Sequence, residues 1–295
     1  MTRFFHLHLI LGLLACAPTM EAQLDAAPFG ETDDEVSEAD SFCSEETSCD
    51  HQAVTSSNRC VFFIGFDGSG VYSPDAGTNV GRLYEMTSGP AALGGGGKWS
   101  GTVNADTTRA YLEGVPGLPF GASADRVDRG LSALCQHLDK RPAPCDIVMM
   151  GYSRGAIIAN QVAVAIDHDG CGSDGRHRGA EIAFFGAFDP VHTQMGNEWR
   201  GRAWGHRIPD NVVRFVQVYK DPHKDPRGWP EGSFLTTTPH AADNARTSCS
   251  RGLTSNEHPD SEPWHHGQIG HNQLPRDIML CALERHGIDL AAAHP

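Results

Sequence analysis

The feature that most constrains this chain is a glycine–serine pentapeptide set between two apolar segments. Residues 151–155 read G-Y-S-R-G, with Ser153 at the centre. The mostly apolar residues 146–150 before it predict a buried strand, and residues 154–166 after it predict a buried helix. Glycines two positions on either side of the serine allow a tight turn without a Cβ clash. Ser153 is therefore expected on a sharp strand-to-helix turn.

A serine on such a turn is typical of the nucleophile elbow of the α/β-hydrolase fold. Strand-like and helical segments alternate along the chain, which predicts a mostly parallel central sheet with helices on both faces. The predicted strands are 61–66, 147–150, 181–188 and 212–219, and the predicted helices are 124–138, 154–166 and 274–285. Residues 71–122 interrupt this pattern and include four consecutive glycines at 94–97. We expect an irregular insertion there, in the position of a lid or a substrate wall.

A serine hydroxyl needs a base to accept its proton and an acid to orient that base. In α/β-hydrolases the acid follows the serine in the chain, and the histidine follows the acid. Asp189 comes directly after the predicted strand 181–188, so it is the first candidate for the acid. Asp221 follows the next predicted strand and is the alternative.

The histidine is expected in the glycine-containing segment before the last helix. Position alone does not separate His265, His266 and His271. The oxyanion formed on attack needs two backbone N–H donors. One is expected from Arg154, the residue after the serine, and the other from Asp67 or Gly68 in the loop after the first strand.

The N-terminal region predicts export. An apolar stretch too short to span a bilayer ends in L-L-A-C at residues 13–16, which resembles a bacterial lipobox. Residues 1–16 are thus expected to be a signal peptide with lipidation of Cys16, and the alternative is ordinary cleavage near Ala22. Residues 17–58 predict an acidic, disordered tether, because 21–51 contain eleven Asp and Glu and no Lys or Arg. Residues 59–295 then form one catalytic domain in the cell envelope or outside the cell.

Charge and cysteine content bear on the expected partners, disulfides and cofactors. The formal net charge is −14 and no basic stripe occurs, so a nucleic-acid partner is not expected. The eight cysteines besides Cys16 suggest disulfides in an exported protein, with no way to choose among the pairings. The chain contains no C-x-x-C and no H-E-x-x-H spacing, and we expect neither a catalytic metal nor a cofactor.

Six short segments, in this order, resemble an uncharacterised α/β-hydrolase family that includes the phospholipase effectors of type VI secretion. They are F-D-G-S-G at 66–70, T-N-V-G-R-L-Y at 78–84, Y-L-E-G-V-P-G at 111–117, G-Y-S-R-G-A at 151–156, F-D-P-V at 188–191 and H-G-Q-I-G at 266–270. The resemblance implies that Ser153, Asp189 and His266 are the catalytic residues and that the substrate is a lipid. Gln268 stands where the family usually has an aspartate.

These observations predict an exported serine esterase that acts on lipid or another carboxylic ester and meets the membrane through its anchor. The departure at Gln268 motivates an alternative, a non-catalytic lipoprotein that keeps the hydrolase fold as a scaffold. Amide or thioester cleavage by the same residues is a third reading.

Overall fold

The computed structural model describes residues 60–94, 103–104, 106–114, 122–140, 145–190, 198–199, 202–203, 208–220, 247–253, 255–260 and 264–291. All of them belong to one compact unit. The predictions for the signal sequence, Cys16, the acidic tether and Asp221 lie outside the described residues.

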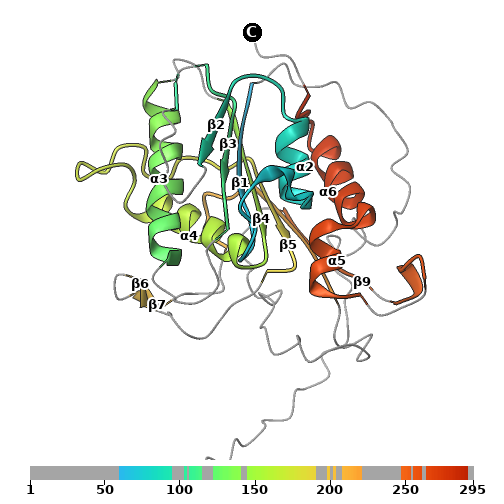
Figure 1. The fold of residues 1–295 in the computed structure, drawn as a ribbon. Helices are drawn as coiled ribbons and strands as arrows, with labels where there is room; N and C mark the ends of the chain where they lie inside the picture. The colour runs from blue at the N-terminus through green and yellow to red at the C-terminus, as the bar shows by residue number, and fades with distance from the viewer. Residues whose placement is uncertain are drawn as a thin grey trace, which may run out of the picture. The chain divides into compact units, whose positions relative to one another are not determined.

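The fold is built on a seven-stranded sheet in which every neighbouring pair of strands is parallel (Figure 1). In spatial order the strands are β2 (Ala91–Gly94), β3 (Arg109–Leu112), β1 (Val61–Phe66), β4 (Asp146–Tyr152), β5 (Phe184–Phe188), β8 (Arg214–Lys220) and β9 (Thr247–Leu253). A separate two-stranded ribbon pairs β6 (Glu198–Trp199) with β7 (Arg202–Ala203).

Helices cover both faces of the sheet, as Figure 1 shows. α3 (Ala122–Lys140) and α4 (Arg154–His168) pack on one face. α2 (Asn79–Met86), α5 (His266–His271) and α6 (Gln273–Arg285) pack on the other. Two 3₁₀ turns, η1 (Pro74–Ala76) and η4 (Ser255–Glu257), complete the described elements. This arrangement, with the serine turn between β4 and α4, is the predicted α/β-hydrolase fold.

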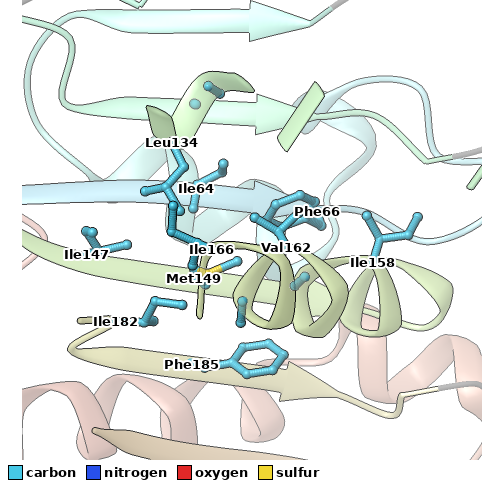
Figure 2. Close-up of a cluster of buried hydrophobic side chains, with 14 of the residues drawn as sticks. Ile64, Phe66, Leu134, Ile147, Met149, Ile158, Val162, Ile166, Ile182 and Phe185 are labelled. Atoms are coloured by element: carbon cyan, nitrogen blue, oxygen red, sulfur yellow. The ribbon is translucent and has the colours of Figure 1, made fainter. Parts of the chain in front are cut away.

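The central strands are buried on both faces, which explains why they read as continuous apolar runs rather than as alternating patterns. On the face shown in Figure 2, Ile64, Met149 and Phe185 from three adjacent strands meet α4. The helix presents Ile158, Val162 and Ile166 to them. All six side chains are at most 2% exposed. On the opposite face, Phe63, Val148 and Met150 belong to the second apolar cluster, with α2, α5 and α6.

The segment 71–122 corrects one expectation. Its described part is not an excursion from the sheet, because it supplies α2 and adds β3 and β2 beside β1. The two strands are four residues long and β3 begins with Arg109, so they lack the apolar run that identifies the central strands. The pairing of β3 with β1 and of β2 with β3, rather than local sequence, defines them.

The order of the strands reverses beside β1. From β1 the chain goes to β2 and β3 on one side, and then to β4, β5, β8 and β9 on the other. Ligands in open parallel sheets bind where the order reverses in this way, beyond the carboxyl ends of the strands. Asp67, Glu113, Ser153 and Asp189 directly follow β1, β3, β4 and β5 and therefore share this edge.

Two disulfides have both of their cysteines defined and lie away from that edge, and Cys281 on α6 is disulfide-bonded as well. Cys60 and Cys145 immediately precede β1 and β4, so their bond joins the amino ends of two adjacent strands. Cys135 on α3 is bonded to Cys171, just after the C-terminus of α4. The sequence predicted disulfides but not these pairings.

Candidate active site

Ser153 occupies the strand-to-helix turn expected of a nucleophile. Its φ of 55° and ψ of −128° form a conformation that non-glycine residues rarely adopt. Its backbone N–H donates to the carbonyl oxygen of Phe188 on the neighbouring strand at 2.9 Å. The surrounding sheet therefore maintains the strained turn, and the serine is 7% exposed.

The two glycines of the pentapeptide are required by close backbone packing. A Cβ on Gly151 would lie 2.3 Å from the Cα of Ala156, and one on Gly155 would lie 2.2 Å from the carbonyl oxygen of Phe66. Both distances are far below van der Waals contact. The second contact also places the start of α4 directly against the end of β1.

His266 lies between Ser153 and Asp189. Its Nε2 is 2.8 Å from the Oγ of Ser153, and its Nδ1 is 2.6 Å from Oδ2 of Asp189. Asp189 has a φ of 39°, and its own N–H donates to the carbonyl oxygen of Val218 at 2.7 Å. The residues that directly follow β4 and β5 thus form, with the first residue of α5, one continuous Ser–His–Asp chain of hydrogen bonds.

The other histidine candidates lie elsewhere. His265 is exposed and precedes α5, where its N–H donates to the side-chain oxygen of Gln268 at 2.8 Å. His271 is exposed at the end of α5 and packs edge-on against the ring of Tyr152. Asp221, the alternative acid, lies outside the described residues.

Tyr152, the variable residue before the serine, orients His266 and was not identified from the sequence. Its ring stacks on the imidazole of His266 with centroids 5.1 Å apart, and its hydroxyl donates to the carbonyl oxygen of His266 at 3.2 Å. A Cβ on Gly270 would lie 2.3 Å from this ring. The sequence shows an aromatic residue within the pentapeptide. Its contact with His266, however, depends on where α5 packs.

Of the three residues expected to donate to the oxyanion, Arg154 and Gly68 lie near Ser153, and the N–H of Asp67 is used elsewhere. Arg154 begins α4, so its backbone lies at the helix N-terminus beside Ser153, where developing negative charge is stabilised. The N–H of Asp67 instead donates to the carbonyl oxygen of Leu112 at 3.0 Å and extends the sheet. Gly68 is the residue near the nucleophile, because a Cβ placed on it would lie 3.0 Å from the Cβ of Ser153.

The carboxylate of Asp67 forms a buried cluster behind Gly68. Its Oδ1 accepts the N–H of Gly68 at 2.9 Å, and its Oδ2 accepts the hydroxyls of Thr78 at 2.5 Å and Tyr111 at 2.6 Å. Burial raises the pKa of Asp67, although these three donors act in the opposite direction. The sequence placed Asp67 and its loop at the site, but gave no role to this side chain or to its two hydroxyl partners.

A buried ion pair braces the adjacent loop. Arg126 on α3 donates to the carboxylate of Glu113 at 3.1 Å and to its carbonyl oxygen at 3.0 Å, and both side chains are at most 7% exposed. Glu113 follows β3 and precedes Gly114, which packs against the Gly68 loop.

Within the described ranges, no group of three or more His, Cys, Asp or Glu is placed to hold a metal ion. No helix there is both long and apolar enough to cross a bilayer.

Comparison with known proteins gives similarity at the level of folds. No protein-family model and no curated protein matches the chain. An uncharacterised protein from Pseudomonas aeruginosa is 14% identical with a TM-score of 0.49, over 80% of this chain and 48% of that one. This chain therefore spans about half the length of the Pseudomonas protein. The RedJ thioesterase of Streptomyces coelicolor is 13% identical with a TM-score of 0.38, over 77% of this chain and 86% of that one.

Proposed function

We propose that this protein is an exported serine hydrolase that cleaves carboxylic esters of lipids. The observation that carries the proposal is the position of His266, which reaches Ser153 with one ring nitrogen and Asp189 with the other. This is the arrangement that activates a serine hydroxyl at neutral pH. The family resemblance of the six sequence segments supports phospholipid as the substrate class.

The reaction follows from the hydrogen bonds. The Ser153 hydroxyl donates to Nε2 of His266, so the neutral imidazole carries its proton on Nδ1 and donates it to Asp189. As the serine oxygen attacks the ester carbonyl, Nε2 takes the serine proton. Asp189 stabilises the resulting imidazolium and holds its orientation.

The tetrahedral intermediate carries its negative charge on the former carbonyl oxygen. We expect the backbone N–H of Arg154, at the N-terminus of α4, to receive it, whereas the N–H of Gly68 donates to Asp67. The imidazolium then gives its proton to the leaving alcohol, and an acyl group remains on Ser153. Water, activated by the same imidazole, releases the carboxylic acid and restores the serine.

Two further features favour a lipid substrate. Tyr72, four residues after Gly68, is 55% exposed, and an exposed aromatic side chain there suits contact with an acyl chain. The expected lipid anchor at Cys16 would hold the enzyme at a membrane surface. The narrower reading, a phospholipase, rests on the resemblance alone.

The test is fatty-acid release from phosphatidylcholine and phosphatidylglycerol vesicles by the mature protein, beside its Ser153→Ala variant. We expect release by the wild type and none by the variant. A panel of short p-nitrophenyl esters and an acyl thioester, run with the same two proteins, separates a lipase from a general esterase or thioesterase. If a folded wild type acts on none of these substrates and does not react with a fluorophosphonate, the scaffold alternative replaces the proposal.

A further inference from the structure

The helix that carries His266 is short. α5 runs from His266 to His271 and has six residues. A helix of this length is not stable by itself in water, because so few internal hydrogen bonds do not offset the cost of nucleation. His266 must nevertheless keep Nε2 at 2.8 Å from the Oγ of Ser153 and Nδ1 at 2.6 Å from Oδ2 of Asp189. The position of the base therefore depends on contacts that hold α5 from outside.

Two side chains from other elements bind backbone carbonyl oxygens of α5. The hydroxyl of Tyr152 donates to the carbonyl oxygen of His266 at 3.2 Å. The side-chain amide of Asn79 donates to the carbonyl oxygen of Ile269 at 2.9 Å. Ile269 belongs to the last turn of α5, where carbonyl oxygens have no partner within the helix. Asn79 thus supplies a donor that the short helix lacks, from a position 190 residues away in the chain.

Asn79 is itself held firmly in place. It is the first residue of α2 and is 0% exposed. Thr78, directly before it, caps the helix: its hydroxyl oxygen accepts the N–H of Gly81 at 3.0 Å, and its proton goes to the carboxylate of Asp67 at 2.5 Å. Asp67 directly follows β1. The donor to α5 is therefore connected to the central sheet through a single neighbouring residue.

The amide of Asn79 makes poor use of its other polar atom. Its Oδ1 is buried and has no hydrogen-bond partner among the described residues. A buried polar atom without a partner costs folding free energy. An apolar side chain would fill the same space without this cost, so packing alone does not explain an asparagine here. The hydrogen bond to Ile269 does explain it.

We propose that Asn79 is a positioning residue for the catalytic histidine: its amide fixes the backbone of α5 so that His266 reaches Ser153 and Asp189 at the same time. This inference rests on the proposed function and adds to it a residue outside the Ser–His–Asp chain. Asn79 is too deeply buried to meet the substrate, and it acts through Ile269. Its loss should therefore lower kcat and leave KM nearly unchanged, because a small displacement of a catalytic group slows the chemical step.

The test compares Asn79→Leu with Asn211→Leu, which is a matched control. Asn211 is also buried, at 7% exposed, its amide donates to the backbone carbonyl oxygen of Ala180 at 3.0 Å, and its Oδ1 likewise has no partner among the described residues. It lies just before β8, at the amino ends of the strands and away from the serine. Leucine removes either amide with little change in volume.

For Asn79→Leu we expect kcat for a p-nitrophenyl ester to fall about tenfold, with KM within about twofold of the wild type. Asn211→Leu should keep the wild-type kcat, although both variants should have a lower melting temperature. The rates are measured well below both melting temperatures, so that folded proteins are compared. Equal kcat values for the two variants would overturn the proposal. If Asn79→Leu does not fold, Asn79→Ser takes its place, because its shorter side chain also leaves the Ile269 carbonyl without this donor.

Labelling of Ser153 by a fluorophosphonate separates this inference from the proposed function, because it needs no knowledge of the natural substrate. The reagent also requires His266 to take the serine proton, so we expect the second-order labelling rate of Asn79→Leu to fall in parallel with kcat. A lower melting temperature with a wild-type labelling rate would show a merely structural role, and would reject the positioning role while the serine hydrolase stands. An unreactive wild-type serine would reject both.

Discussion

The two edges of the central sheet are stabilised in different ways. At the amino edge, the Cys60–Cys145 disulfide joins β1 to β4 just before both strands begin. At the carboxyl edge, the same two strands end in Asp67 and Ser153, where hydrogen bonds and close backbone contacts hold the chain. Positive φ angles at Ser153 and Asp189 add strain at this edge. The Cys60–Cys145 bond thus lies where no chemistry is expected.

This difference follows from the separate roles of the two edges, reaction at the carboxyl edge and strand register at the amino edge. A serine hydrolase needs groups that exchange protons and tolerate developing charge, so its site consists of buried polar groups, which cost stability. The strands must nevertheless keep their register within a fraction of an ångström for His266 to reach both partners. A disulfide at the opposite ends of β1 and β4 fixes this register without entering the site. Variants at the carboxyl edge should therefore affect rate, and variants at the amino edge should affect stability.

The largest effect is expected for Asp189→Asn at the carboxyl edge. An asparagine amide facing Nδ1 of His266 favours the wrong tautomer, with the proton on Nε2, which then cannot accept the serine proton. We expect kcat to fall about 10⁴-fold, with the free energy of unfolding within about 1 kcal/mol of the wild type. Ester hydrolysis and urea denaturation measure the two quantities. A variant that loses stability but keeps most of its rate would remove the distinction between the edges.

For Cys60→Ala/Cys145→Ala at the amino edge, we expect a loss of stability and no loss of rate. The bond closes a loop with a sequence separation of 85, so its removal should lower the free energy of unfolding by about 4 to 5 kcal/mol in the chain-entropy model. At a temperature where the variant is folded, kcat should match the wild type. Cys135→Ala/Cys171→Ala, with a separation of 36, is the matched control and should lose about 4 kcal/mol. Urea denaturation and kcat are measured for the wild type and for both double variants, and the changes in stability and in rate are compared.

How far the sequence predicts each edge also differs. The apolar runs identified β1, β4, β5 and β8, because a strand buried on both faces needs a continuous apolar sequence. Short β3 gave no such signal, although it supplies Tyr111 and forms part of the wall of the site. The serine was identified by a local motif, since the strained turn is formed by neighbouring residues.

The partners of the serine depend on tertiary packing. Asp189 was placed by its position after a strand, whereas three histidines remained equivalent until the family resemblance favoured His266. Which of them faces the serine is decided by the docking of α5 on Tyr152. The hydroxyls of Thr78 and Tyr111 meet Asp67 from positions 11 and 44 residues away, and the disulfide pairings likewise depend on contacts that no local pattern encodes.

A smaller, pH-dependent effect is expected at the amino edge from His286. It follows α6, accepts a hydrogen bond from Arg214 at the start of β8 at 3.3 Å, and packs near Phe184 at the start of β5. Burial and the nearby positive charges of Arg214 and Arg285 lower the pKa of His286 to about 4. Because the unfolded pKa is higher, about 6.5, this neutral histidine contributes its full stability above that value.

The contribution should be lost as the pH falls from about 6.5 toward 4. Allowing for partial exposure, we expect a decrease of about 1 to 2 kcal/mol over this range. His286→Gln, which cannot be protonated, should show a shallower decrease in urea denaturation. Since His286 is distant from the serine, its substitution should leave kcat at pH 8 unchanged. An identical pH dependence in the two proteins would exclude His286 as the titrating group.

The smallest effect is expected for Gln268→Glu, at the helix that carries His266. His258 accepts the N–H of Asp260 on Nδ1, so its proton is on Nε2, which lies 3.0 Å from the amide nitrogen of Gln268. Two donors therefore face each other, because the oxygen of Gln268 already accepts the N–H of His265. A glutamate would offer an acceptor to both. We expect a gain of about 1 kcal/mol in the free energy of unfolding at pH 7.

The matched control is Gln273→Glu, at an exposed glutamine that begins α6. A glutamate there interacts with the helix dipole but has no such histidine partner among the described residues. Urea denaturation of both variants separates the two causes. A gain confined to Gln268→Glu would assign it to the contact with His258. Equal gains would mean that the helix dipole accounts for them. In the first case, an unchanged kcat would further show that the contact between His258 and Gln268 stabilises the start of α5 without affecting His266. The carboxyl edge could then be stabilised without loss of rate.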